Sequence, residues 1–406
     1  MKPINWRAAA LNLAVLLVSC FVCLAATEVF LRRWFPIQGL VYQLDPRCIY
    51  RLIPNARKTV WVDTDEGRSR VLLTINSSGY RGPELGSGPP PRRVLVYGDS
   101  FIEAEYTRTE ETFAWRLQEK LSAGLQSPVE VINAGVAGYG PDQISVRMQD
   151  EIGSLKPSVV VVSIYVGNDF GDLLRNKLYR LDDSGRMVEN SWKVDSSLER
   201  DFEGARRRSD LQVVRGAQLV ARMLSSGEGS ARTLDPDVLA RNHIEHSLRR
   251  CAEDYEDFVV GGNDKVFAIF RDAYDADVSL FPTSDSARYK VRLMAQVLGR
   301  IKRISDDNSV PLLLMIIPSP IDVCKTYETR VKRRVYENYR PTRLTTLTED
   351  LAKRHGIDTL NLYDPYAASN PDSLYFRHGN DHWNSAGQDL AADLAAKRIL
   401  ADGLIR

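Results

Sequence analysis

The sequence predicts a three-layer α/β/α protein with a parallel sheet, an N-terminal membrane segment and a long insertion. Short apolar segments of strand character alternate with amphipathic segments of helical period, which indicates a parallel sheet covered by helices on both faces. Residues 158–165 form a continuous run rich in Val and Ile, typical of a strand buried on both sides. The chain has 406 residues, of which 44% are hydrophobic and 26% charged, so it can bury a sizeable core.

The N-terminal segment has the length and composition of a membrane span. Residues 8–27 contain no charged side chain, and Lys2 and Arg7 precede them. Twenty helical residues at about 1.5 Å each match a hydrocarbon core of about 30 Å. Residues 32–34 are Arg-Arg-Trp, and these residue types are common at the membrane interface. We interpret residues 1–35 as an uncleaved signal anchor with the rest of the chain outside the cytoplasm.

Two processing events are alternatives to an anchor. Residues 17–20, Leu-Val-Ser-Cys, resemble a bacterial lipobox, in which Cys20 would be lipidated after cleavage. Small residues at 23–25 also suit a signal-peptidase cut. The apolar run continues past Cys20 to Ala26, however, where a mature lipoprotein turns polar. The sequence favours the anchor and leaves both alternatives open.

Residues 36–91 are predicted to form a β-leaning entry segment that ends in a Pro-rich linker. Residues 59–62 and 71–75 have strand character, and Asp-Glu-Gly between them provides turn chemistry. A Gly-Ser-Gly-Pro-Pro-Pro run at 86–91 then separates this segment from the main domain.

The main domain is predicted over residues 92–406. Its expected strands lie at 94–97, 129–133, 158–165, 311–317 and 359–362. The expected helices lie at 111–125, 142–155, 286–305 and 342–355, with a terminal helix from about residue 384. Residues 170–285 do not follow this alternation of strands and helices, and we interpret them as a partly helical insertion. The insertion could cover the site, dock a partner, or be a solvent-exposed addition with no direct role.

Four short blocks carry the chemistry. The first predicted strand ends in Gly-Asp-Ser at 98–100. A serine at the carboxyl end of such a strand lies in the crevice where open α/β sheets bind ligands, and glycine permits the sharp turn before it. The other blocks are Asn-Ala-Gly-Val-Ala-Gly at 133–138, Gly-Asn-Asp at 167–169 and Asp-His-Trp-Asn at 381–384.

Together these blocks resemble those of the GDSL/SGNH hydrolase superfamily, over residues 92–185 and 286–400. The resemblance implies the SGNH hydrolase fold, with a flavodoxin-like strand order, and a serine esterase or O-acyltransferase. The third block departs from the family pattern Gly-x-Asn-Asp, because Gly167 directly precedes Asn168.

Acyl transfer needs a nucleophile, a base and donors for the developing oxyanion. Ser100 supplies the hydroxyl. His382 is the best candidate base, because it lies in a loop just before the last helix, where the chain returns to the strand ends. The expected oxyanion donors are the backbone N–H groups of Ser100 and Gly138 and the side-chain amide of Asn168. The reaction requires no cofactor, and the sequence has no zinc-ligand spacing.

The acid that orients the histidine is not at the position where the family commonly has it. In the family it commonly lies two or three residues before the histidine, where this chain has Asn380 and Gly379. Asp381 is directly adjacent to His382, and consecutive side chains of an extended segment point in opposite directions. Asp381 therefore reaches His382 only through a turn. We predict Asp381 as the acid; a distant carboxylate, or a Ser-His dyad steadied by a backbone carbonyl, are the alternatives.

The expected function is that of an extracytoplasmic esterase or O-acyltransferase acting on an acylated carbohydrate or a lipid-linked, cell-surface glycan. A similar layout occurs in bacterial SGNH-type proteins associated with polysaccharide modification. A non-catalytic glycan-binding or assembly component and a lipase or lysophospholipase-like enzyme are the competing hypotheses. The net charge of +1 gives no indication of a nucleic-acid partner.

Overall fold

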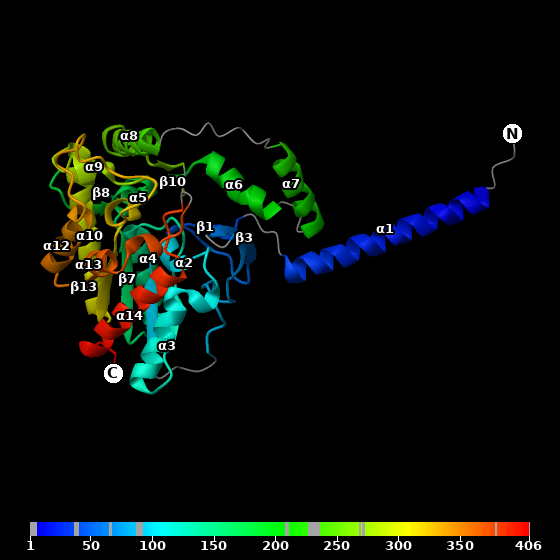
Figure 1. Ribbon diagram of the computed structural model, residues 1–406, viewed down its shortest axis with the longest axis horizontal. Coiled ribbons are helices and arrows are strands. Elements are labelled where there is room, and N and C mark those ends of the chain that lie inside the picture. The colour runs from blue at the N-terminus through cyan, green and yellow to red at the C-terminus, as the bar shows by residue number, and fades with distance from the viewer. Residues whose placement is uncertain are drawn as a thin grey trace.

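A five-stranded parallel sheet forms the centre of the protein (Figure 1). Its strands occur in the order β13-β12-β7-β5-β6, which is 2-1-3-4-5 when read from the other edge and counted along the chain. This is the predicted flavodoxin-like order. The computed structural model describes residues 6–35, 40–64, 67–86, 92–207, 211–225, 236–267, 269, 273–377 and 380–405. The sheet strands are β5 (Arg93–Tyr97), β6 (Glu130–Asn133), β7 (Val159–Tyr165), β12 (Leu312–Ile317) and β13 (Asp358–Asn361).

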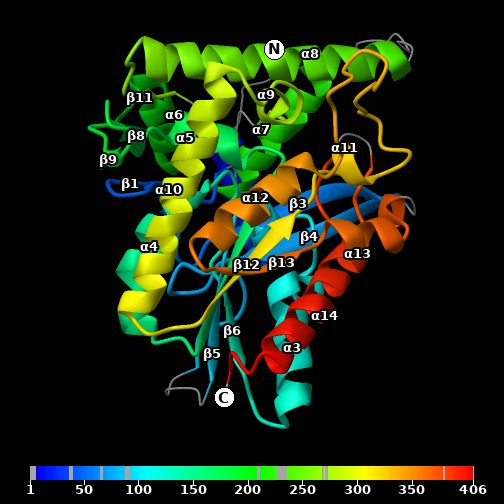
Figure 2. The ribbon, with the colours of Figure 1, turned by 90° about the vertical axis from the view of Figure 1, so that its left-hand side faces the viewer.

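Two apolar cores lie on the two faces of this sheet. Every residue of β7 is buried, and its side chains alternate between the cores: Val160 and Val162 belong to one, Val159 and Val161 to the other. This alternation explains the continuous apolar run in the sequence. Helices α4 (Pro141–Leu155), α10 (Asp285–Asp307) and α12 (Arg343–Arg354) cover one face, and α3 (Phe113–Leu125) and α14 (Ser385–Ala401) cover the other (Figure 2). The predicted three-layer fold is confirmed.

The entry segment consists of two antiparallel hairpins that share the core of the main domain. They are formed by β1 (Tyr42–Asp45) with β2 (Ile49–Leu52) and by β3 (Arg57–Thr64) with β4 (Gly67–Thr74). Tyr50 is fully buried, and its hydroxyl donates to the carbonyl oxygen of Ala137 at 2.7 Å. The segment is therefore packed against the predicted site region. Of the linker predicted at 86–91, only Gly86 lies within the described residues.

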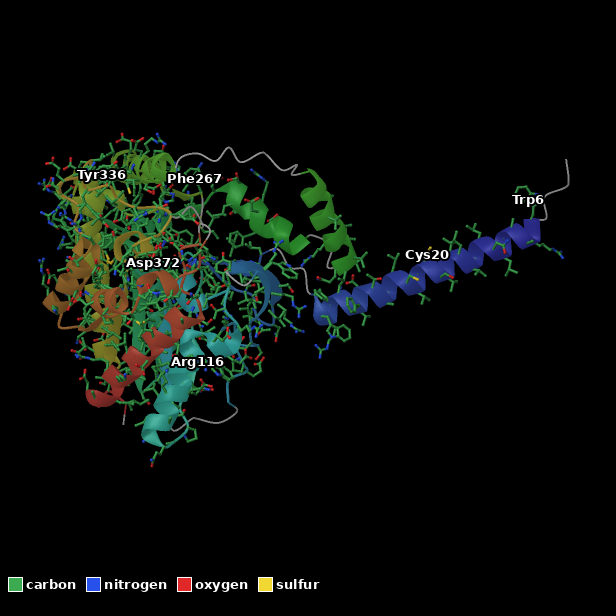
Figure 3. All side chains as sticks on the ribbon, in the orientation of Figure 1. Trp6, Cys20, Arg116, Phe267, Tyr336 and Asp372 are labelled. Atoms are coloured by element: carbon green, nitrogen blue, oxygen red, sulfur yellow. The ribbon has the colours of Figure 1, made fainter. Side chains whose placement is uncertain are left out.

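Helix α1 (Trp6–Trp34) extends away from the body of the protein (Figure 1). None of its residues is buried, and the labelled side chains of Trp6 and Cys20 project from it into open space (Figure 3). It is the one helix among the described residues that is long and apolar enough to cross a membrane, a test that a signal sequence also passes.

The predicted insertion is partly helical, and α8 runs across the top of the domain (Figure 2). The first turn of α7 contacts the end of α1, because the backbone N–H of Val213 donates to Glu28 Oε2 at 3.0 Å. From residue 169 to 284 the elements are α5 (Asp169–Asn176), β8 (Tyr179–Leu181), β9 (Met187–Glu189), β10 (Lys193–Val194), α6 (Ser196–Arg207), α7 (Gln212–Ser225), α8 (Pro236–Tyr255), a π-helical turn (Glu256–Val260), β11 (Lys265–Val266) and α9 (Ala276–Leu280). Short helical elements elsewhere are α2 (Ser100–Glu103), α11 (Pro320–Val323), α13 (Tyr363–Ala368) and the 3-10 turns Thr109–Glu111 and Pro371–Ser373.

A buried ion-pair cluster ties the insertion to α10. The ammonium group of Lys290 is fully buried and lies 2.8 Å from Asp275 Oδ1 and 2.9 Å from Asp277 Oδ1.

Replacing Lys290 with Met leaves two buried carboxylates without their counter-charge, so we expect the free energy of unfolding to fall by about 3–5 kcal/mol. Urea unfolding followed by circular dichroism measures this. The matched control is Lys302→Met, on the same helix but partly exposed and paired with Asp306 one turn away, for which we expect a loss of at most about 1 kcal/mol. Equal losses in the two variants would contradict the assignment.

Candidate active site

The first block forms a sharp turn between β5 and α2. A Cβ atom on Gly98 would lie 2.1 Å from Ser163 Oγ and 2.4 Å from Ile102 Cγ1, so only glycine fits. Asp99 caps the helix, because its Oδ1 atom accepts a hydrogen bond from the backbone N–H of Phe101 at 2.9 Å. The turn therefore presents Ser100, half-buried, at the carboxyl end of β5 and at the first position of α2.

His382 lies against Ser100 although 282 residues separate them in the chain. Its Nε2 atom is 2.7 Å from Ser100 Oγ, and its ring stacks on Phe101 with 5.0 Å between the ring centroids. The next residue, Trp383, is fully buried, and Asn384 caps α14 by accepting from two backbone N–H groups. The buried ring and the capped helix hold the loop in place, so the chemical and the capping interpretations of this block are compatible.

Two side chains contact the other ring nitrogen of His382. Asn380 Oδ1 lies 2.8 Å from Nδ1, and Asp381 Oδ1 lies 3.2 Å from it. Asn380 Oδ1 also accepts a hydrogen bond from the backbone N–H of His382 at 3.1 Å. This hydrogen bond forms the turn through which the Asp381 side chain can reach His382. Asp381 Oδ2 accepts from the Tyr165 hydroxyl at 2.8 Å. Sequence reasoning did not consider Asn380 as a partner, although an Asn two residues before the histidine was a visible signal.

The second block packs against the turn that carries Ser100. The backbone N–H of Val136 donates to the carbonyl oxygen of Gly98 at 3.1 Å, and a Cβ atom on Gly135 would lie 2.3 Å from the backbone nitrogen of Glu103. Ala137 N–H donates to the Glu103 carboxylate at 2.6 Å. The loop then continues to Gly138, which is buried and has φ +74°, a conformation that favours glycine. These contacts hold the Gly138 loop beside α2.

Asn168 is the middle residue of the third block, and its side chain does not cap the helix that follows. It is the N-cap residue of α5, but its side chain makes no capping hydrogen bond. The residue is 5% exposed, and its Oδ1 atom is buried without a hydrogen-bond partner among the described residues. The side chain of Asn168 therefore does not cap α5, and it is the acceptor oxygen of its amide that lacks a donor among the described residues.

Asp169, the next residue, organises the loop. Its Oδ2 atom accepts from the backbone N–H of Tyr165 at 2.9 Å. Burial, together with the neighbouring charge of Asp99, raises the pKa of Asp169 well above its usual range. Asp99 and Asp169 thus both accept hydrogen bonds from nearby backbone N–H groups.

Glu103 is a residue of this region that sequence reasoning missed. It is fully buried, and its carboxylate accepts from the Tyr42 hydroxyl at 3.0 Å and from Ala137 N–H. The guanidinium of Arg81, also from the entry segment, donates to the carbonyl oxygens of Glu103, Ala104 and Thr107. Glu103 thus links the entry segment, the Ser100 helix and the Gly138 loop. No motif marks it, because its partners lie far away in the sequence.

Glu103 is expected to make stability depend on pH. Burial, and then the charge of Glu105, raise the pKa of Glu103 to about 7. A carboxyl group whose pKa is raised by folding stabilises the folded state at low pH, and this contribution is lost as the pH rises through the folded-state pKa. We expect the free energy of unfolding to fall between pH 5 and pH 8, and to fall less steeply in Glu103→Gln. Chemical denaturation at each pH measures both slopes, and the exposed Glu110→Gln should keep the wild-type slope. A variant slope as steep as that of the wild type would contradict this expectation.

A cavity of about 610 Å³ adjoins the histidine. Tyr106 and Phe376 line it, and the Tyr106 ring centroid lies 5.2 Å from that of His382. The backbone N–H of Phe376 donates to the carbonyl oxygen of His382 at 2.8 Å. The entry hairpin β3–β4 also contributes to the lining, which contains arginine, serine and aromatic residues. The volume falls in the range of ordinary ligand pockets, about 300–1,000 Å³.

One group of residues has the types and proximity of metal ligands within the described part of the chain. It consists of Cys251, Asp275 and Asp277, all buried. The ammonium of Lys290 contacts both of these carboxylates and already supplies their positive partner. The group is remote in sequence from the four blocks and belongs to the ion-pair cluster described above.

Among comparisons with known proteins, only solved structures show similarity to this chain. No protein-family model matches the chain, and no curated protein sequence matches it. An esterase from Pseudoalteromonas sp. is 14% identical, with a TM-score of 0.36, over 76% of this chain and 97% of that one. An acetyl xylan esterase is 14% identical, with a TM-score of 0.37, over 76% of this chain and 99% of that one. A GDSL-like lipase from Bacteroides thetaiotaomicron is 11% identical, with a TM-score of 0.34, over 77% of this chain and 89% of that one.

Proposed function

We propose that the chain is a serine esterase or O-acyltransferase of the GDSL/SGNH type that forms an acyl-enzyme on Ser100. The observation that carries the proposal is the distance of 2.7 Å between His382 Nε2 and Ser100 Oγ. A serine hydroxyl becomes a nucleophile when an adjacent base takes its proton, and this is the distance at which a base can do so.

The proposed reaction proceeds in two halves. Ser100 Oγ attacks the ester carbonyl carbon as His382 takes its proton, and negative charge collects on the carbonyl oxygen. The backbone N–H groups of Ser100 and Gly138 and the amide of Asn168 stabilise this charge. The tetrahedral intermediate then expels the alcohol, which takes the proton from His382, and leaves an acyl ester on Ser100. Water or an acceptor hydroxyl next attacks the acyl carbon, again with His382 as base, and Ser100 recovers its proton.

The adjoining cavity favours a carbohydrate substrate over a lipid. The described residues that line it are largely polar or charged, and they include the aromatic residues Tyr106 and Phe376. A long acyl chain needs an apolar lining, whereas sugars suit a polar groove with aromatic rings. An acylated cell-surface or lipid-linked glycan is therefore the substrate class we propose. The contact between Ser100 and His382 also disfavours a purely binding protein, because binding alone does not require a base beside this hydroxyl.

We further propose that α1 anchors the protein in a membrane, with the catalytic region outside the cytoplasm. Its length, its apolar composition and its lack of buried residues support this. Protease added to intact spheroplasts should digest the catalytic region. Protection until the membrane is opened would reverse the orientation. Mass spectrometry of the mature N-terminus separates an intact anchor from cleavage at Cys20.

Covalent labelling tests the proposed function directly. Full-length protein in non-ionic detergent is treated with diethyl p-nitrophenyl phosphate and digested for mass spectrometry. We expect one diethylphosphoryl adduct, on Ser100, and none in Ser100→Ala or in heat-denatured protein. Hydrolysis of p-nitrophenyl acetate, with and without added oligosaccharide acceptors, then separates an esterase from a transferase. Absence of an adduct, with turnover equal in wild type and Ser100→Ala, would favour the binding-protein hypothesis.

The two partners of His382 Nδ1 should differ in their contributions. Only the Asp381 carboxylate can stabilise the imidazolium by charge, whereas Asn380 can hold the ring orientation alone. Asp381 is 41% exposed, which weakens that effect. We expect Asp381→Asn to lower kcat/KM for p-nitrophenyl acetate by roughly 10–100-fold and Asn380→Ala by less than about tenfold. A larger loss in Asn380→Ala would make the amide the principal partner of His382.

A further inference from the structure

We propose that the cavity beside His382 is a binding groove for an oligosaccharide that carries anionic groups, carboxylate or phosphate. This inference rests on the proposed function and specifies its substrate. Tyr106 lies between the groove and the site: it lines the groove, and its ring lies against those of His382 and Phe376. Ser100 and His382 do not line the groove themselves, so a sugar chain bound there reaches Ser100 only by extending past Tyr106.

Three arginines from separate parts of the chain meet at this groove. Arg68 belongs to β4 of the entry hairpin, Arg108 directly precedes the turn Thr109–Glu111, and Arg377 lies in the loop before His382. All three are exposed. Glu111 is the one carboxylate among the described lining residues; Asp65 and Glu66 lie outside the described residues. Because the whole chain has a net charge of only +1, this positive cluster is a local feature.

Arginine is suited to bind anionic groups on a sugar chain. Its planar guanidinium matches carboxylate and phosphate with two parallel hydrogen bonds. Arg68 lies over the Trp61 ring, 5.7 Å from its centroid, and Arg377 donates to the carbonyl oxygen of Asp372 at 3.2 Å. A guanidinium carries five N–H donors, so such a contact is compatible with an anion at the same side chain.

The alternatives fit the lining less well. An acyl chain in this groove would offer no hydrogen-bond acceptor to the guanidinium groups that line it, and it would displace water from them, which is costly. A neutral glycan would contact the aromatic residues but would make no ionic contact with the three arginines. An anionic glycan uses both features, with the rings of Tyr106 and Phe376 beneath the sugars and the arginines at their charged groups.

Binding to defined oligosaccharides tests the inference. Full-length Ser100→Ala protein in non-ionic detergent is titrated calorimetrically with oligogalacturonate, phosphorylated mannopentaose and neutral xylopentaose. We expect at least one anionic ligand to bind at least tenfold more tightly than xylopentaose at 50 mM NaCl, and to weaken several-fold at 300 mM because salt screens exposed charges. The combined variant Arg68→Gln, Arg108→Gln and Arg377→Gln should weaken binding on the order of tenfold. The matched control is Arg116→Gln on α3, an arginine that does not line the groove (Figure 3).

Each outcome has a defined meaning. Tight binding of oligogalacturonate alone assigns the anion as carboxylate, and tight binding of phosphorylated mannopentaose alone assigns it as phosphate. Equal binding of the neutral ligand, or an unchanged affinity in the triple variant with an unchanged melting temperature, overturns the inference. Because binding is measured without the Ser100 hydroxyl, its failure is separate from failure of the labelling experiment.

Discussion

Replacing His382 with alanine is expected to lower kcat/KM for p-nitrophenyl acetate hydrolysis by about 10⁴-fold or more. The physical reason is the contact of 2.7 Å between His382 Nε2 and Ser100 Oγ, since without the base the hydroxyl keeps its proton and attacks poorly. Ser100→Ala should cost about as much. The double variant should be no worse than either single variant, because the two residues act as one unit.

The control for this prediction is a histidine outside the site. His355 ends α12 and is exposed, so His355→Ala should change the rate by less than about twofold. Initial rates for the wild type and the four variants, with circular dichroism to confirm folding, provide the measurement. Activity of His382→Ala within tenfold of the wild type would contradict a mechanism that uses this histidine as base.

The fold could be predicted because its signals are local. The Val/Ile run at 158–165 requires burial on two faces, and the structure has β7 at Val159–Tyr165. The pairing of Ser100 with His382 was also accessible, since parallel strands end at one edge of a sheet and the last loop returns there. The predicted element boundaries therefore agree with the structure to within one or two residues in most cases.

The missed contacts depend on tertiary packing that no local pattern encodes. Tyr42 and Glu103 are 61 residues apart, and neither lies in a recognisable motif. Arg81 lies within the predicted entry segment and outside any motif, yet its guanidinium is buried against the Ser100 helix. The sequence shows Asn380 at the position where the family commonly has the acid, but it does not show that Asn380 contacts His382. The turn that brings both Asn380 and Asp381 to His382 depends on side-chain geometry.

Asn168→Ala is expected to lower kcat by about 10²–10³-fold, with a much smaller effect on KM. A donor aimed at the developing oxyanion acts in the transition state and little in the ground state, so its loss appears in kcat. The prediction rests on the place of Asn168 shortly after the end of β7 and on the fact that its side chain does not cap α5. Steady-state kinetics with p-nitrophenyl acetate separate the two constants.

Two further variants distinguish an oxyanion donor from a structural amide. Asn168→Asp keeps the size but replaces the N–H donors with negative charge, so it should be at least as slow as Asn168→Ala. Asn361 ends the edge strand β13, and its side chain donates to Glu349 Oε2 and accepts from the backbone N–H of Tyr363, so Asn361→Ala removes an amide that has a structural role. If Asn168 were structural, its variants would resemble Asn361→Ala, with lower unfolding free energy and nearly unchanged kcat. A selective loss of kcat at unchanged stability is the result that an oxyanion donor requires.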